Sequence, residues 1–427
     1  MILKNNIGEE RNSQDRKTIL KNIDDPVGEK PDTAKRNTEE VKKDKKFLVF
    51  LIIGILGIIG GVGCILFGCF GFKNTVNEVI FLQINQNEID VVGYSALTGD
   101  ALMDGASVNA PAYCIQTPNG MDGARPQAGL NEAGVIFEAI AEAGITRFAA
   151  IYQNPSSAVI GPIRSLRIYY LEWDTPFDCT IVHAGGAYDA LMAVRSGGYR
   201  DLSEDYAYMY RGTYGGRLWN NLFTTASYLK QFSEDYSYNE SNINGFSRMT
   251  PEESERARID ASAVEKLNII KSTDSDVSEL TVEVSNVAIN FGGFASFNVR
   301  YAYDVDTNTY YRSYESGDAH EVYACDAVDL GEKNPEDVCT LTQMNPAVVV
   351  AMVVQEGKAS DNYHEDIVTI GTGDAYIFQN GTVIEGSWSK SAINEQIKFF
   401  DEEGKEVALA PGQTFVSAVP AYGSIEY

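Results

Sequence analysis

The sequence predicts one membrane-spanning helix followed by an exported α/β domain, with a mostly parallel sheet and helices, and then a β-rich domain. Three observations support this fold class. Residues 47–72 form an apolar run without a single charge. Strand-like and helix-like patterns alternate through residues 109–229, which is typical of an α/β domain. From residue 281 to 427 the pattern is that of strands alone, separated by turn residues.

The apolar run predicts the anchor. It is 26 residues long, and a helix rising about 1.5 Å per residue would cross a hydrocarbon layer about 30 Å thick. Four lysines stand immediately before the run, whereas only Lys73 follows it closely. The positive-inside rule therefore places residues 1–46 in the cytoplasm, as a disordered tail, and the C-terminal domains outside the cell membrane in a single-pass topology.

Two cysteines, Cys64 and Cys69, lie inside the apolar run. The segment "LFGC", which ends at Cys69, is close to a bacterial lipobox. A lipid carried on Cys69 is therefore the alternative to a retained helix, although Phe67 is bulky for that motif and the preceding leader is long.

The other four cysteines fall into two pairs of different character. Cys114 and Cys179 each lie in a short apolar run, and we expect buried thiols. Cys325 and Cys339 flank a polar loop in a region expected outside the cell, where disulfides form. We predict a disulfide between them, which would close a loop of about 15 residues; two free thiols are the alternative.

The charge balance excludes one class of partner. The whole chain has a formal net charge of −26, and from Lys73 onward it holds 22 basic against 50 acidic residues. Such a surface repels nucleic acid and anionic lipid, so we expect no nucleic-acid partner. The sequence also indicates no cofactor and no metal site, because His320 and His364 lie among acidic residues without metal-ligand spacing and are expected to be solvated.

The exported part divides by pattern into a stalk or linker (73–108), the α/β domain (109–229), a helical and loop connector (230–280) and the β-rich domain (281–427). Within the α/β domain we expect strands over 110–118, 145–153 and 178–186 and helices over 131–143, 164–174 and 187–194. In the β-rich domain, Asn380-Gly381 between two alternating runs predicts a β-hairpin.

Several segments, in order, resemble one known bacterial family. They include "SALTG" (95–99), "ARPQAGLNEAGVIFEAIAEAGITRFAAIYQ" (124–153), "IGPIRSLRIYY" (160–170), "DCTIVHAGGA" (178–187) and "GTGDAYIFQNGTVIEGSWSK" (371–390). Together they resemble the YerB-type lipoproteins, a two-part domain of unknown function, over about residues 94–427. The resemblance implies an outward-facing protein of the cell envelope and carries no established chemistry.

The chain departs from that family in three places. Ala96 stands where proline is usual, and in "WNNLF" Asn220 replaces a histidine while Asn221 keeps the family's asparagine. An apolar helix replaces the usual lipid anchor. The loss of the histidine argues against a reaction that depends on it.

Arginine usage gives the first candidate site. There is no lysine between Lys73 and Lys230, yet eight arginines. Exclusive use of arginine indicates planar, bidentate contacts with carboxylates or phosphates. Arg164 and Arg167 would lie in the first turn of a helix, where an anion is favoured. The alternative is an internal network in which these arginines pair with Glu138 and Glu142, four residues apart on the preceding expected helix.

The segment His183-Ala184-Gly185-Gly186 gives the second candidate site. It lies where a strand should end and a helix begin, the place at which α/β sheets hold ligands. His183 is the only histidine of the expected α/β domain, so it is the candidate acid or base. A core histidine beside a tight turn is the alternative.

These observations lead to one main hypothesis and two alternatives. The main hypothesis is a membrane-anchored envelope protein that binds a small anionic or peptidoglycan-derived ligand, or an envelope partner. The expected pocket contains Arg125, Glu138, Glu142, Arg147, Arg164, Arg167, Gly185, Gly186 and Asn221. The alternatives are an envelope hydrolase or transferase with His183 as acid or base, and a purely structural docking module. Whether the protein is an enzyme stays open at this point.

Overall fold

The computed structural model describes residues 91–103, 106–212, 220–259, 286–325 and 334–427. The expected tail and membrane span lie outside the described residues. Among the residues that are described, no helix is both long enough and apolar enough to cross a membrane. Residues 89–427 form one compact unit.

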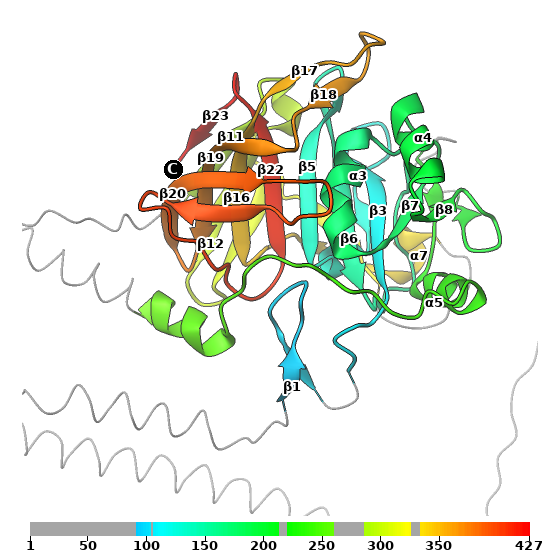
Figure 1. The fold of residues 1–427 in the computed structure, drawn as a ribbon, viewed down its shortest axis with the longest axis horizontal. Coiled ribbons are helices and arrows are strands. Elements are labelled where there is room, and N and C mark those ends of the chain that lie inside the picture. Colours follow the sequence, from blue (N-terminus) through cyan, green and yellow to red (C-terminus); the bar gives the residue numbers. More distant parts are fainter. Residues whose placement is uncertain (1–90, 104–105, 213–219, 260–285, 326–333) are drawn as a thin grey trace, which may run out of the picture. The chain divides into compact units, whose positions relative to one another are not determined.

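A ten-stranded sheet runs through this unit (Figure 1). Its strands, in spatial order, are β21 (Lys398–Asp401), β20 (Thr382–Lys390), β19 (Gly371–Gln379), β16 (Val348–Val354), β22 (Thr414–Pro420), β5 (Val135–Glu142), β6 (Ile145–Gln153), β3 (Ala112–Pro118), β7 (Thr180–His183) and β8 (Arg200–Ser203). The strands from the two halves of the chain meet where β22 pairs with β5 in parallel.

The expectation of a mostly parallel sheet is wrong, because the sheet is mixed. Within the expected α/β domain, the pairings of β3 with β7 and of β7 with β8 are parallel, whereas those of β5 with β6 and of β6 with β3 are antiparallel. The N-terminal half turns antiparallel because a tight turn joins β5 directly to β6, and β6 then pairs with β3. A hairpin leaves no room for the crossover helix that a parallel pair requires.

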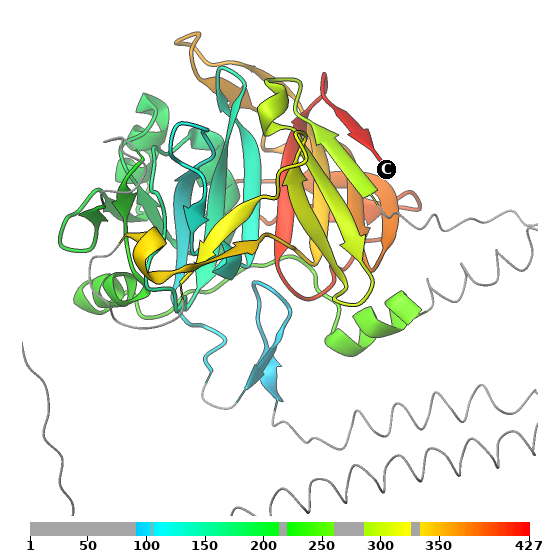
Figure 2. The same cartoon turned by 180° about the vertical axis from the view of Figure 1, so that it is seen from behind.

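Both faces of the sheet are covered. Helices α3 (Ile168–Asp174) and α4 (Tyr188–Ser196) pack on one face, and α5 (Ala226–Asp235) packs on the other. A four-stranded sheet also covers that second face, with the order β13 (Thr309–Tyr314), β12 (Val299–Asp304), β11 (Asn286–Asn290) and β23 (Ser424–Glu426). Figure 2 shows it from behind, on the side away from α3.

The remaining elements are short. A hairpin of β1 (Val91–Tyr94) and β2 (Ala101–Met103) forms within the expected stalk, and residues 251–259 of the connector are helical. The others are β4 (Gln127–Ala128), β9 (Tyr210–Arg211), β10 (Leu222–Phe223), β14 (Glu321–Ala324), α7 (Pro335–Val338), β15 (Thr340–Gln343), β17 (Glu356–Lys358), β18 (Glu365–Ile367) and the 3-10 turns η1 (Leu130–Glu132), η2 (Thr175–Phe177) and η4 (Ala295–Phe297).

The helix expected over 131–143 is wrong, because this segment is strand β5 after the single turn η1. Its alanines and glutamates favour a helix, but seven of its eight residues are buried between two covered faces and pair with β6 and β22. Tertiary context overrides intrinsic propensity here. A bulge between Ile140 and Glu142 also breaks the strict alternation of side chains.

The helix expected to begin at Arg164 begins only at Ile168. Residues 164–167 cross the ends of β3 and β7 instead: the Arg164 N–H donates to the Gln116 carbonyl (2.7 Å), and the Arg164 carbonyl accepts from the Ala184 N–H (3.0 Å). Arg164 and Arg167 therefore do not share a helical turn. By contrast, the hairpin expected at Asn380-Gly381 joins β19 to β20, with positive φ at both residues.

The cysteines form two disulfides. Cys325 and Cys339 are bonded as the sequence predicts. The expectation of free thiols at Cys114 and Cys179 is wrong, because they form a second disulfide with a Cα–Cα distance of 5.7 Å. Cys114 lies on β3 and Cys179 immediately precedes β7, the parallel neighbour of β3, so the pairing of the strands brings the two together.

A buried ion pair joins the two halves of the chain. Arg312 on β13 donates to Glu138 on β5 at 2.7 Å, and neither side chain is exposed to solvent. Thr146 and Asn119 also donate to Glu138, at 2.8 Å and 3.2 Å. Burial lowers the pKa of Arg312, but the attraction of Glu138 outweighs it and the net direction is upward. Arg312 therefore stays charged at neutral pH.

His320, expected in solvent, is buried beside this pair. Burial first, and then the positive charge of Arg312, hold the pKa of His320 well below its ordinary value, so the ring is neutral. Because its Nδ1 faces an N–H of Arg312, Nδ1 accepts and Nε2 donates to Gln127 (3.1 Å). The histidine thus extends the network instead of lying in a solvated loop.

We predict that Glu138→Gln destabilises the unit by about 3–5 kcal/mol, because Arg312 would stay buried without a counter-charge. Urea unfolding of residues 89–427 measures the change. Glu406→Gln is the matched control, since its ion pair with Lys398 is exposed and should contribute less than about 1 kcal/mol. Similar losses in the two variants would contradict the prediction.

Candidate functional site

The candidate site is an arginine cluster, defined here as Arg147, Arg164, Arg167 and the carboxylate of Glu142. Glu142 accepts from Arg147 at 2.7 Å and from Arg167 at 2.5 Å. The side chains of Arg147 and Arg167 are each 5% exposed, and that of Glu142 is 14% exposed. Burial alone would raise the pKa of Glu142, but the two guanidinium groups lower it below its ordinary value. The carboxylate is therefore ionised and shared between two arginines.

Three elements position these side chains where β5 ends and β6 begins, at one end of the central strands of the sheet. Glu142 ends β5, Arg147 follows the turn into β6, and Arg167 closes the extended segment before α3. Arg147 also donates to the Ser165 carbonyl (2.8 Å) and Arg167 to the Leu166 carbonyl (3.0 Å). The bulge in β5 turns Glu142 toward the α3 face, whereas Glu138 points to the opposite face. The two glutamates therefore do not share a site.

Arg164 differs from its neighbours in having no side-chain partner. It is partly buried, and its guanidinium makes no hydrogen bond or ion pair with any described residue. Burial lowers its pKa first; Glu142 and Asp122 then raise it, while Arg167 and Arg211 lower it. The Nε atom of Arg167 is also buried without an acceptor. The cluster thus has three guanidinium groups and one carboxylate, which bonds to two of them. The donors of Arg164 and the Nε of Arg167 have no acceptor among the described residues.

The H-A-G-G segment lies beside the arginine cluster, since Gly186 forms a parallel β-bridge with Leu166. Gly185 has a φ of +67°, a left-handed conformation that favours glycine, and open space lies where a side chain would begin. Backbone of this loop leads directly into α4. Because its residues are small, the loop leaves open space beside the segment that carries Arg164.

His183 is fully buried and both ring nitrogens are engaged. Nδ1 lies 2.7 Å from the Gly185 carbonyl oxygen and Nε2 lies 2.9 Å from Asp201 Oδ1. Both ring nitrogens are thus engaged by oxygen atoms, one from the glycine loop and one from β8. No lone pair of His183 faces an open site, and the geometry favours a structural role in fixing the glycine loop.

Three other expected pocket residues lie outside the arginine cluster. Arg125 donates to Asn119 (2.9 Å) and stacks on Tyr314, with 3.8 Å from its Cζ to the ring centre. It therefore belongs, like Glu138, to the buried network around Arg312. Asn221 donates to the Gly212 carbonyl (2.9 Å) and accepts from Arg211 (2.9 Å). Asn220, where the family carries histidine, donates to the Asp122 carboxylate (3.0 Å).

Sequence reasoning missed Arg312 as a partner of Glu138, although a signal was present. In "TYYRSY" (309–314), Arg312 alternates with Tyr310 and Tyr314, and all three side chains are buried. An arginine at an inward position of a strand needs a buried counter-charge. The alternation therefore predicts a buried carboxylate opposite, even though it does not say which one.

The hairpin of β17 and β18 covers the far end of β5, where Glu142 forms a backbone bridge with His364. At its base, Glu356 accepts from the Tyr422 hydroxyl at 2.7 Å, while its other oxygen is buried without a partner. Burial raises the pKa of Glu356 to about 7, assisted by Glu365 and opposed by Tyr422 and Lys358. The side-chain carboxyl group of Glu356, whose pKa is about 7, thus belongs to the hairpin that covers Glu142 of the arginine cluster.

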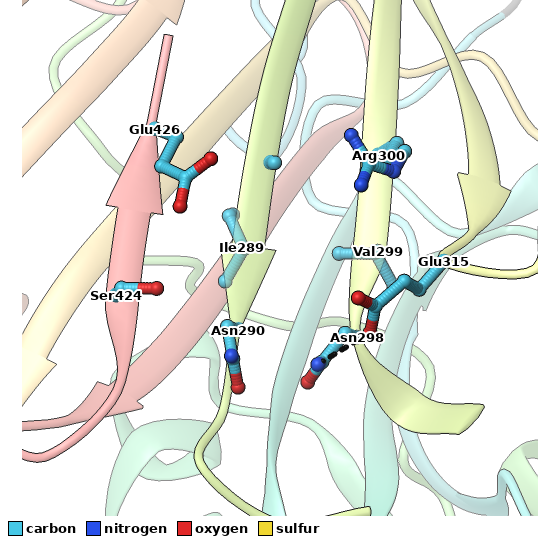
Figure 3. Close-up of a pocket in the computed structure, with 9 residues that line it drawn as sticks. Ile289, Asn290, Asn298, Val299, Arg300, Glu315, Ser424 and Glu426 are labelled. Atoms are coloured by element: carbon cyan, nitrogen blue, oxygen red, sulfur yellow. Dashed lines mark hydrogen bonds between the residues drawn. The ribbon is translucent and has the colours of Figure 1, made fainter. Parts of the chain in front are cut away.

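Two hollows in the C-terminal half do not suit an anion. One, of about 60 Å³, lies on the outer face of the four-stranded sheet, where Asn298 donates to Glu315 at 2.7 Å (Figure 3). It has room for about four waters. The other, of about 640 Å³, is lined by five carboxylates and a single lysine, Lys405. Repulsion from those carboxylates would exclude an anionic ligand there.

We predict opposite outcomes for Glu142→Gln and Arg164→Gln. Loss of the Glu142 charge leaves two buried arginines unpaired and should cost about 3–5 kcal/mol. Loss of Arg164 breaks no bond to a described residue and should change stability by less than about 1 kcal/mol. Urea unfolding of both variants measures this; a large loss in Arg164→Gln would show that its guanidinium holds the fold together.

We predict that Glu356 makes the unit less stable as the pH rises. Its pKa is raised from 4.5 to about 7 in the folded state, so the folded state binds the proton more tightly. That contribution is fully present below pH 4.5 and is lost as the pH rises through 7. Glu356→Gln should therefore raise the melting temperature at pH 8.5 and change it little at pH 4.5. An equal shift at both pH values, or one matched by the exposed control Glu426→Gln, would contradict this.

Comparison with known proteins shows which family this chain resembles. Two family models match, the N-terminal domain of a protein of unknown function (DUF3048) over residues 97–239 and its C-terminal domain over residues 287–416. A protein of Bacillus subtilis (strain 168) named "Putative lipoprotein YerB" is 27% identical over 355 residues, which is 80% of this chain and 92% of that protein.

A solved structure agrees with the fold. The crystal structure of the YerB protein from Bacillus subtilis matches with a TM-score of 0.59 and 23% identity, over 78% of this chain and 99% of that one. The two family models follow the order of the two halves that meet at β22 and β5. The chain is therefore a member of the YerB-type DUF3048 family, a two-part domain of unknown function.

Proposed function

We propose that this protein is a membrane-tethered protein of the cell envelope that binds a small carboxylate- or phosphate-bearing ligand at the arginine cluster. The ligand class we favour is a peptidoglycan fragment, whose stem peptide ends in a carboxylate. The lipoprotein name of the YerB relative and the apolar run at 47–72 support the tether. The arginine cluster supports the ligand class.

The observation that carries the proposal is the guanidinium of Arg164, which has no partner among the residues that the structure describes. A partly buried charged group without a hydrogen-bond partner is costly unless a ligand or water supplies one. Its neighbour Glu142 already serves Arg147 and Arg167. The cluster therefore has an excess of positive charge and free donors, which is the complement of a small anion.

The position of the cluster supports the same reading. Arg164 lies where β3 and the parallel strand β7 end, between the Gln116 carbonyl and the Ala184 N–H. Ligands of sheets with parallel strands bind outside the carboxyl ends of those strands, at loops such as the one at Gly185. A half-buried loop of small residues there would let a ligand approach the backbone closely.

The charge of the rest of the chain supports a small ligand over a polymer. With 50 acidic residues against 22 basic ones from Lys73 onward, the surface repels a polyanion. A single carboxylate or phosphate would experience mainly the local field of the cluster. The engaged nitrogens of His183 favour binding over acid–base catalysis at this site.

The test is isothermal titration of residues 89–427 with a muropeptide, with the same muropeptide amidated at its terminal carboxylate, and with inorganic phosphate. We expect the free acid to bind, and Arg164→Gln to weaken binding by about 1.5–3 kcal/mol, the contribution of a charged hydrogen bond. Arg195→Gln, on the exposed side of α4, is the matched control and should bind normally. Unchanged binding in Arg164→Gln, or no binding of any anion, would overturn the proposal.

A further inference from the structure

The hairpin of β1 and β2 carries an exposed apolar surface, which we call the hairpin patch. Its members are Val91 (45% exposed), Val92 (52%), Tyr94 (41%) and Met103 (48%). Neither strand pairs with any other strand of the described residues. Two strands by themselves are marginally stable in water, and exposed apolar clusters mark surfaces that another phase or partner covers.

The hairpin is fixed to the body at its turn and is free at its other end. Leu97 in the turn is buried, and its carbonyl accepts from the Arg248 side chain at 2.6 Å. Ser95 donates to Gln153 on β6 at 3.4 Å. The open end, at Val91 and Met103, therefore points away from the sheets, as the hairpin below the body in Figures 1 and 2 shows.

The sequence before the hairpin favours one occupant for the patch. Only 18 residues separate Phe72, the end of the apolar run, from Val91. Even fully extended, at most about 3.6 Å per residue, they reach no farther than about 65 Å. The tether therefore holds the hairpin near the membrane from which the chain emerges, and Tyr94 is of the type that lies at membrane interfaces.

We propose that the hairpin patch rests on the outer surface of the lipid bilayer. This inference assumes the tether of the proposed function. The contact is apolar: from residue 74 to residue 124 there is no lysine or arginine, so nothing in this region attracts anionic headgroups. Raising the salt concentration should leave the contact unchanged, unlike a contact made by basic residues.

The contact sets the direction in which the arginine cluster faces. Strand β5 begins beside the hairpin's turn, where Gly134 adjoins Leu97, and ends at Glu142. Its 8 residues span about 26 Å at about 3.3 Å per residue. In both views the β17–β18 hairpin, which covers Glu142, lies at the end opposite β1. A bilayer-bound hairpin therefore presents the arginine cluster away from the membrane, toward the cell wall.

Photocrosslinking of the full-length protein in vesicles tests the proposal. Benzoylphenylalanine replaces Tyr94, or Tyr363 as the matched control, an exposed tyrosine between β17 and β18. The vesicles contain phosphatidylcholine and phosphatidylglycerol, and mass spectrometry counts lipid adducts. We expect several-fold more adduct at position 94 than at position 363, in low and high salt, and a decrease when Val92→Ser and Met103→Ser are added.

Flotation of the same vesicles distinguishes failure of the hairpin contact from failure of the membrane tether. If the protein floats and position 94 gives no more lipid adduct than position 363, the hairpin does not rest on lipid and the inference is overturned. If the protein does not float, the tether itself is wrong and the proposed function loses its membrane component. Adducts at position 94 that disappear in high salt would also overturn the apolar contact.

Discussion

The buried pair of Glu138 and Arg312 is the constraint on which the arrangement of the two halves depends. Each charge is costly in the core, and each is tolerable only because the other half of the chain supplies its counter-charge. The aromatic faces around Arg312, including Phe415 at 4.7 Å, exclude water from the pair. Once β5 and β13 are placed by this contact, the parallel pairing of β5 with β22 completes one sheet from two sequence segments.

This constraint explains why the sequence predicts local elements better than their assembly. The strand at 145–153 and the hairpin at Asn380-Gly381 follow from local alternation and turn chemistry, and both are present. Strand β5 does not follow from local pattern. Its helix-forming residues adopt a strand because both of its faces are buried and because it pairs with β22, 279 residues farther along the chain. The antiparallel pairings of β5 with β6 and of β6 with β3 follow from that one misassigned element.

The candidate site was predictable in its residue types and not in its grouping. Arginines without lysines indicate paired carboxylates or a bound anion. The structure contains the paired carboxylates, at Glu138 and Glu142. The bulge at the end of β5 separates the two glutamates, so Glu138 stabilises the interior while Glu142 joins Arg147 and Arg167. No periodicity in the sequence marks a bulge of one residue, and this single irregularity decides which arginines are internally paired. The disulfide of Cys114 and Cys179 was missed for a similar reason, because it depends on which strands are neighbours.

The same separation bears on the anion site that we propose for this strongly acidic protein. If each arginine had its own carboxylate, the cluster would have no net positive charge to attract an anion. If the arginines had no carboxylate at all, burying their charges would cost too much free energy. Glu142 supplies the counter-charge that Arg147 and Arg167 share, although the Nε of Arg167 is left without an acceptor among the described residues. Arg164 stays unpaired among the described residues, beside the glycine loop. The excess positive charge of the arginine cluster therefore lies at the end of β5 opposite the β1–β2 hairpin.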